Sequence, residues 1–248
     1  MPSQEELSAY YAQMMREGNY KIGCISKRSN RIKFSYLMER IMESCRRLQL
    51  TPCKTLLDIG CFTGDFLDIA KEHGFETYGF DTLSEALSSI SDRHHVWSGS
   101  LFAAPRNLPR FDLVTLNDTI EHIADYKHEL LFIRKRLLRK KGVLFITTPD
   151  ATSSVARLMG YRWGALDGHE HLLVYSKYGL SVLLRSSGFH IRRIKRYSKR
   201  MELGYLNAMI SKWEFGGRIK PFPLPRFASR LKVPVYAGDI FVVAQAAG

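Results

Sequence analysis

The chain has 248 residues, of which 45% are hydrophobic, and it carries 37 Lys and Arg against 24 Asp and Glu, a formal net charge of +13. This length and apolar content are sufficient for one large buried core. No apolar run reaches the roughly 18 residues that a membrane-spanning helix needs, and the N-terminal sequence MPSQEELS is too polar for a signal peptide. We therefore expect a cytoplasmic protein.

Four cysteines lie in the first quarter of the chain, at Cys24, Cys45, Cys53 and Cys61. Their spacing matches no common metal-binding pattern, so we expect free thiols in a reducing compartment. Cys61 falls inside a glycine-containing turn, where a small side chain matters more than a reactive one.

The first 150 residues alternate between helix and strand patterns. Residues 1–54 are expected to be helical, with a helix over 32–48 that ends before Thr51-Pro52. This alternation predicts a Rossmann-like, doubly wound α/β sheet that is mostly parallel, with helices on both faces. Strands are predicted at 55–59, 76–80, 94–97, 111–116 and 142–148, and helices at 64–73, 83–91 and 125–138.

The pattern changes after residue 150. Residues 151–175 are irregular and rich in glycine and aromatic residues, and a helix over 176–187 follows with Ser176 as its N-cap. A strand begins at Phe189, the stretch PFPLPRF is expected to be extended, and the last strand spans 238–246. Three parts of a single structural domain are expected: an N-terminal helical lid and first helix (1–54), a nucleotide-binding core (55–150), and an acceptor-site and closing segment (151–248).

The segment from Thr55 to Asp81, TLLDIGCFTGDFLDIAKEHGFETYGFD, is the most informative part of the chain. A buried strand leads into a turn bracketed by Gly60 and Gly64, a helix follows, and a second strand ends in an acid. Glycines let the backbone approach a nucleotide, and an acid about 20 residues on accepts hydrogen bonds from ribose hydroxyls. The spacing fits neither the dinucleotide fingerprint G-x-G-x-x-G nor a phosphate-binding loop that ends in GK[ST].

The pattern D-x-G-x-x-x-G, with Asp58 inside the strand end and Asp81 after the second strand, resembles motif I of the class I S-adenosylmethionine (SAM) methyltransferases, usually DxGCGxG. Phe62 stands where that family has its middle glycine, so its side chain must point away from the cofactor or stack near it. The segment DTIEHIADYKHEL looks like the xxxEHxxD stretch of the methyltransferases that modify ubiquinone precursors, sugars and natural products. The resemblance runs from residue 34 to 189. It implies SAM as the cofactor and an antiparallel C-terminal strand hairpin that closes the sheet.

The resemblance also implies which residues hold SAM. The backbone of Gly60, with Cys61 and Gly64 nearby, would pass under its methionine part. Asp58 would orient that turn or face the SAM amino group through water. Asp81 would hold the ribose diol.

Residues further along the chain would complete this site. Thr82 and Leu83 would lie beside the adenine. Ser100 takes the place of an acid that often reads the adenine amino group, so that contact would be weaker or made by backbone. Leu116 and Asn117 would line the methyl-donor end. The resemblance also implies a contact from a cation just before the first domain helix, for which the candidates are Arg31 and Lys33. Tyr10, Tyr11 and Tyr20 are the candidates for an N-terminal lid over the cofactor.

Methyl transfer from SAM is an in-line displacement, so the protein chiefly aligns the reactants and excludes water. A hydroxyl acceptor must also lose a proton, a task that suits a histidine. Two positions provide one: His122 after the fourth predicted strand, and His171, with His169 nearby, before the penultimate helix. The alternative for each is a structural role in bracing its loop.

We predict no metal site. Asp118, Glu121, His122 and Asp125 nevertheless offer oxygen and imidazole ligands close together in the sequence. His94 and His95 enter a predicted strand and are expected at the surface.

The variable segment 151–215 is expected to form the acceptor pocket. Its aromatic and apolar residues suit a lipid-like, aromatic or glycosidic acceptor, and Arg157 and Arg162 could pair with phosphate or carboxylate. The residues expected to line this pocket are Met159, Tyr161, Arg162, Trp163, Leu166 and Tyr175.

Positive charge is concentrated near the C-terminus. Between Arg185 and Lys232 the chain has thirteen Lys or Arg against two acids, Glu202 and Glu214. This excess is either an ordinary solvated face or a surface for an anionic small substrate, an anionic membrane or nucleic acid. The segment has no clear amphipathic apolar face, and the sequence does not indicate an oligomeric state.

We favour a SAM-dependent O-methyltransferase that acts on a small-molecule, quinone-like or glycan acceptor. One alternative is an RNA methyltransferase, which the positive charge favours. We see no added RNA-binding module, however, and the tetrapeptide at 117–120, NDTI, is not the NPPY-like motif for base amino groups. The other alternative is a non-catalytic scaffold, which Phe62 and Ser100 favour.

Overall fold

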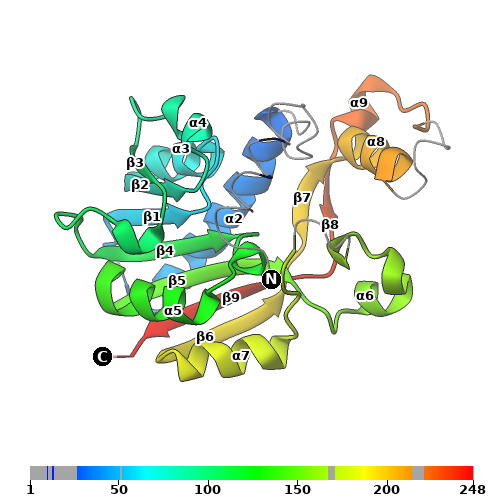
Figure 1. Cartoon of the computed structure of the whole chain (residues 1–248). Coiled ribbons are helices and arrows are strands. Elements are labelled where there is room, and N and C mark those ends of the chain that lie inside the picture. The colour runs from blue at the N-terminus through cyan, green and yellow to red at the C-terminus, as the bar shows by residue number, and fades with distance from the viewer. Residues whose placement is uncertain are drawn as a thin grey trace.

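A seven-stranded sheet forms the centre of the molecule (Figure 1). The computed structural model describes residues 10, 13, 27–50, 52–166, 171–213 and 221–247. In spatial order the strands are β3 (His95–Ser98), β2 (Glu76–Asp81), β1 (Thr55–Ile59), β4 (Phe111–Asn117), β5 (Leu138–Pro149), β9 (Asp239–Ala246) and β6 (Phe189–Arg196).

The first five of these strands are mutually parallel, and β9 is antiparallel to both β5 and β6. Both closing strands come from the last third of the chain yet join the same sheet. The predicted fold class is therefore confirmed, including its antiparallel closing strands.

Helices cover both faces of the sheet. On one face α2 (Lys27–Arg47), α3 (Asp65–Glu72) and α4 (Ser84–Ser88) lie over a core that contains Leu56, Leu113 and Phe145. On the other face α5 (Tyr126–Phe132) and α7 (Lys177–Ser186) pack on Leu57, Val114 and Leu144. Consecutive residues of β1 and β4 thus enter opposite cores, as expected for strands buried on both faces.

Several predicted boundaries shift. The helix predicted at 83–91 is only the five-residue α4, and the one predicted at 125–138 is α5 followed by a π-helical turn at Ile133–Leu137. Ser176 caps α7 as predicted, because its hydroxyl accepts a hydrogen bond from the Gly179 N–H. The irregular segment after β5 contains a short helix, α6 (Ser154–Met159).

The sequence patterns did not predict an arm that projects beyond the sheet (Figure 1). Its strands β7 (Lys199–Glu202) and β8 (Lys232–Val235) pair antiparallel and connect to α8 (Leu203–Trp213) and α9 (Arg226–Ser229). We call residues 199–213 and 221–235 the arm. The stretch expected to be extended is without helix or strand at 221–225 but then turns into α9.

A search of the described helices finds none that combines the length and the apolar character required to cross a bilayer.

Candidate functional site

The turn after β1 is held by its backbone. The N–H groups of Gly60 and Cys61 both donate to the carbonyl of Phe80 on β2, at 2.8 and 3.2 Å. Gly60 has a φ of +80°, and a Cβ added there would lie 2.5 Å from the Oγ1 of Thr119, which follows β4. Only glycine meets both demands, so this turn approaches the end of β4 closely.

Asp81 fastens the same turn. Its carboxylate accepts the N–H of Phe62 at 2.8 Å and the N–H of Leu83 at 3.0 Å. Burial raises the pKa of Asp81, and these backbone hydrogen bonds oppose the rise. Each carboxylate oxygen has a second lone pair, so the acid can hold the turn and still accept hydrogen bonds from a ribose diol.

Phe62 stands where the family has its middle glycine, and its backbone adopts the left-handed conformation that glycine favours, with φ at +46°. Phe62, Tyr10 and Leu172 each pack against the buried Leu83 and Ala86. Tyr10 and Leu83, which were both expected near a bound adenosine, therefore lie in the same cluster of side chains. Tyr11 and Tyr20 lie outside the described residues.

Asp58 lies behind the turn and is fully buried. Its Oδ1 accepts hydrogen bonds from the Thr115 hydroxyl at 2.6 Å and from the Asn117 side-chain amide at 2.9 Å. Burial raises the pKa of Asp58 to about 7, although these two hydrogen bonds lower it. Within the described part of the chain, the buried Asn117 Oδ1 has no hydrogen-bond partner. An ammonium group bound here would satisfy it.

The remaining predicted cofactor residues differ in what they can offer. Cys61 is buried, and burial raises the pKa of its thiol. A Cβ on Gly79 would lie 2.6 Å from the Cys61 Sγ, so the small size of Cys61 matters for packing at the turn. Thr82 is half-buried beside Leu83. Ser100 is exposed and its hydroxyl accepts the Phe102 N–H. Leu116 is wholly within the core, so its side chain supports the site from behind.

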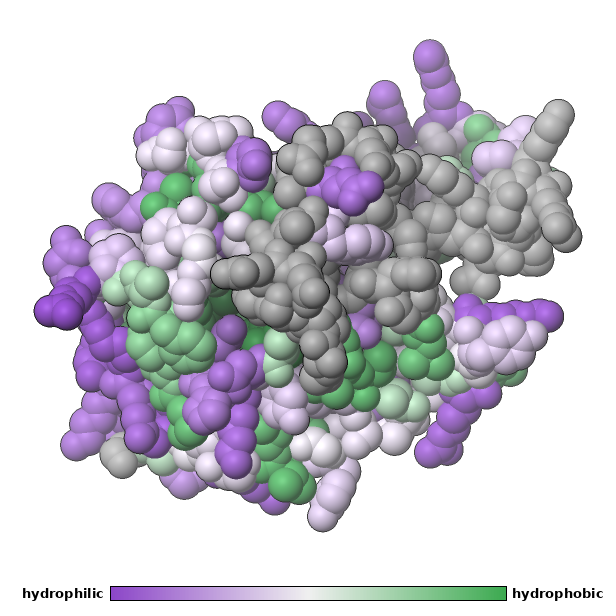
Figure 2. Space-filling view, in the orientation of Figure 1, coloured by the Kyte–Doolittle hydropathy of each residue, from purple (hydrophilic) through white to green (hydrophobic). Residues whose placement is uncertain are grey.

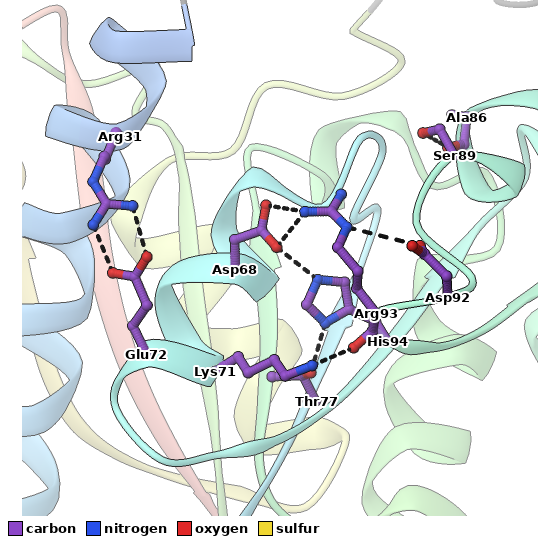
Figure 3. A network of polar contacts seen from close by, with 10 residues as sticks. All are labelled: Arg31, Asp68, Lys71, Glu72, Thr77, Ala86, Ser89, Asp92, Arg93 and His94. Atoms are coloured by element: carbon purple, nitrogen blue, oxygen red, sulfur yellow. Dashed lines mark hydrogen bonds and ion pairs between the residues drawn. The ribbon is translucent and has the colours of Figure 1, made fainter.

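Arg31 does not face the turn. Its guanidinium forms a bidentate pair with Glu72 of α3, both distances being 2.7 Å, on the outer side of the helices (Figure 3). Lys33, the alternative candidate, reaches Asp118 at the end of β4 at 3.0 Å. Asn30, which sequence reasoning missed, donates to Asp65 directly after Gly64 at 2.6 Å. Polar residues in the first turns of α2 were the available signal.

Asp118 is the centre of a charge network at the end of β4. It pairs with Lys33 of α2 and with Lys199 of β7, the latter at 2.9 Å, and Lys199 also contacts Asp239 of β9 at 3.3 Å. Although burial opposes ionisation, Lys199 and Lys33 lower the pKa of Asp118, and Asp118 and Asp239 raise that of Lys199. Four distant segments thus meet here.

Three residues after Asp118, a second cluster brings together both predicted catalytic histidines. One ligand atom from each of Glu121, His122 and His171 lies within 4.8 Å of the others, and the two imidazole centroids are 4.9 Å apart. The Ala165 carbonyl contacts His171 Nδ1 at 2.8 Å, which leaves Nε2 as the atom that can take a proton. Glu121 is fully buried; one carboxylate oxygen accepts from Thr148 at 3.0 Å.

Burial and then Asp118 raise the pKa of Glu121 to about 8. Its other oxygen has no hydrogen-bond partner among the described residues. Glu121, His122 and His171 have the donor types of a metal site. The set suggested by the sequence is not assembled, because Asp118 pairs with lysines and the exposed Asp125 contacts His128 at 2.8 Å. His169 lies outside the described residues.

The prediction that His94 lies at the surface is wrong. Its side chain is buried under α3, with Nδ1 2.7 Å from the Thr77 hydroxyl and Nε2 3.0 Å from Asp68 (Figure 3). Arg93 pairs with the same Asp68. His95 is exposed as predicted. Successive side chains of a strand point to opposite faces, so one of two adjacent histidines is buried and the other exposed. The sequence alone did not show which one is buried.

The residues expected to line the acceptor pocket divide into two groups. Trp163 is buried, and its indole N–H donates to the Ala237 carbonyl at 3.0 Å, so it anchors the segment. Tyr175 is also buried, whereas Tyr161 is exposed. Arg162 stacks on Tyr161 with its guanidinium carbon 5.6 Å from the ring centroid.

The sheet order and the glycine turn after β1 are those of the class I SAM-dependent methyltransferase fold. A family model described as "Methyltransferase domain" matches residues 31–194. The chain belongs to this methyltransferase domain family. A search of curated proteins gives no significant match.

Solved structures share the fold at low sequence identity. A SAM-dependent methyltransferase from Archaeoglobus fulgidus is 21% identical with a TM-score of 0.53, over 84% of this chain and 93% of that one. One from Thermotoga maritima is 17% identical with a TM-score of 0.58, over 96% and 99%. Magnesium protoporphyrin IX methyltransferase from Synechocystis, solved with bound S-adenosylhomocysteine, is 12% identical with a TM-score of 0.53, over 86% and 83%.

Proposed function

We propose that this methyltransferase transfers the methyl group of SAM to an oxygen atom of a small-molecule, quinone-like or glycan acceptor. The observation that carries the proposal is the close approach of the Gly60 backbone to Thr119, whose Oγ1 would lie 2.5 Å from a Cβ added to Gly60. It brings the cofactor turn next to the loop that bears Glu121 and His122, with His171 beside them. Donor and acceptor ends of one site are thus adjacent.

The residues present fit SAM. Asp81 retains acceptor capacity for two ribose hydroxyls, and Leu83 and the Phe62 ring offer an apolar wall. The Asn117 Oδ1, which no described residue hydrogen-bonds, suits an ammonium group. When bound, SAM supplies a methyl group already activated on a sulfonium. The chain aligns the acceptor oxygen with it and excludes water.

The Glu121 cluster serves the acceptor. When the acceptor oxygen is methylated, its hydroxyl proton would pass to the imidazole of His122 or His171. The Ala165 carbonyl fixes the orientation of the His171 ring. The buried carboxyl of Glu121 lies next to both rings and, in its ionised form, stabilises an imidazolium.

The cofactor half of the proposal is tested by calorimetry with S-adenosylhomocysteine. Asp81→Asn replaces an acceptor of two backbone N–H groups by an amide, and we expect a ten- to hundredfold loss of affinity, about 1–3 kcal/mol. The matched control is Asp92→Asn, whose side chain is exposed. No measurable binding by the unaltered chain would leave only a scaffold with this fold.

The acceptor half is tested by following label from the SAM methyl group into a panel of phenols, hydroxyquinones and glycosides. We expect His171→Ala to lower kcat by about 10²–10⁴ and to flatten its pH dependence, with S-adenosylhomocysteine affinity retained. The control is His128→Ala, an exposed histidine outside the cluster. Equal rates for the two variants would exclude His171 as the base, and label in RNA instead would favour the nucleic-acid alternative.

A further inference from the structure

The arm ends in an exposed patch in which apolar and basic side chains alternate. Phe222, Phe227 and Leu231 are 73%, 76% and 53% exposed. Arg226 and Arg230 lie between them and are also exposed. We call these five residues, with the neighbouring exposed Lys232, the arm patch. Figure 2 shows hydrophilic side chains extending outward from this end of the molecule next to hydrophobic surface.

The patch is held in place by hydrogen bonds. The Asn207 side chain on α8 donates to the Phe222 carbonyl at 2.7 Å and accepts its N–H at 3.1 Å. The Leu203 N–H donates to the Leu231 carbonyl at 2.9 Å. Because the backbone on both sides of α9 is fixed to α8, the exposure of the two phenylalanines is a property of the folded arm.

The sequence segment that carries the patch has charges of one sign. The sequence from 215 to 238 contains five Lys or Arg and no Asp or Glu. No ion pair involves Arg226, Arg230 or Lys232 within the described ranges, unlike the exposed Arg31 and Arg93, which have carboxylate partners. Unpaired cations next to exposed aromatic rings are the combination that binds the headgroup region of an anionic bilayer, where rings enter the interface and cations meet phosphates.

We propose that the arm patch docks this methyltransferase on an anionic lipid surface. The arm leaves the sheet at the edge where the site lies, since Lys199, its first residue, contacts Asp118 at the end of β4. Docking therefore places the acceptor site close to the lipid headgroups. Resting here on the proposed function, we infer that the acceptor is a lipid-linked molecule whose polar part carries the hydroxyl.

A basic cleft at the opposite edge of the sheet provides a matched control surface. It has a volume of about 380 Å³ and lies at the amino ends of β4 and β5. Its cations include the exposed Lys135 and Lys140. Exposed aromatic residues are not among its lining residues, so charge there lacks the apolar partner found in the arm patch.

The test is sedimentation of the full chain with vesicles of phosphatidylcholine alone or mixed with phosphatidylglycerol. We expect binding to the mixed vesicles that weakens with salt. Phe222→Ser with Phe227→Ser, which leaves the charge intact, should lower partitioning at least about tenfold. Arg226→Glu with Arg230→Glu should lower it on the order of thirtyfold or more. Lys135→Glu with Lys140→Glu makes the same charge change and should have little effect.

Several results would overturn the proposal. These are no vesicle binding, equal losses for the arm and control variants, retention of binding by the phenylalanine variant, or an RNA gel shift or a dimer that depends on the patch while vesicles are not bound. Calorimetry with S-adenosylhomocysteine on the same variants separates the two proposals. Lipid binding without cofactor binding would defeat the proposed function alone, and cofactor binding without lipid binding would defeat the docking alone.

Discussion

Two carboxylate groups of this site are held in opposite ways. At the β1–β2 edge, Asp81 accepts hydrogen bonds from Phe62 and Leu83, groups within 19 residues of it. At the end of β4, Asp118 is neutralised by Lys33 and Lys199, which are 85 and 81 residues away in the sequence.

The difference explains what each region contributes. The turn after β1 is fixed by backbone contacts within one β1–β2 unit. A charge network assembled from α2, β4, β7 and β9 exists only in the complete fold.

The largest effect is expected from removing the shared cation of the β4 network. Lys199→Met leaves Asp239 buried without a cation and Asp118 with Lys33 alone, so we expect a loss of about 3–5 kcal/mol in the free energy of unfolding. Urea denaturation measures it. Lys33→Met, which removes only one of the two cations of Asp118, should cost less. If both variants lose the same amount, the network does not depend on the arm.

A smaller loss is expected at the turn. Gly60→Ala combines a positive φ with a Cβ 2.5 Å from Thr119 Oγ1, and we expect about 2–3 kcal/mol of destabilisation together with loss of S-adenosylhomocysteine binding. Gly74→Ala has the same strain, with φ at +86°, but no atom within 4 Å. It should cost about 1 kcal/mol and leave binding intact. Thermal unfolding and calorimetry distinguish strain from the close approach of the two regions.

The most gradual effect is the pH dependence of stability. Burial raises the pKa of Asp58 to about 7 in the folded state, whereas in the unfolded chain the pKa returns to its ordinary value of 3.8. Between these values the folded state holds the extra proton, so stability falls as pH rises, by about 1 kcal/mol per pH unit. Asp58→Asn should flatten the unfolding free energy across this range. An unchanged slope would show that Asp58 is ionised throughout.

The sequence by itself determined the sheet and the cofactor turn. Apolar runs between glycines specified the parallel strands, and the spacing of Asp58, Gly60 and Asp81 specified the turn, because these groups act on neighbours within one βαβ unit. It also named His122 and His171, although the evidence for placing them at one site came from family resemblance. That resemblance does not extend to the acceptor.

The tertiary structure decided what depends on distant segments. In the fold, Asp118 pairs with Lys199 instead of joining a metal site, and Arg31 pairs with Glu72. His94 is buried, and β7 and β8 pair to form the arm. The partner of a charged side chain depends on how elements far apart in the sequence pack together. A strand end has several possible partners nearby, and burial removes the water that would otherwise solvate the charge. Periodicity gives the face of each element, and only the assembled fold gives its neighbours.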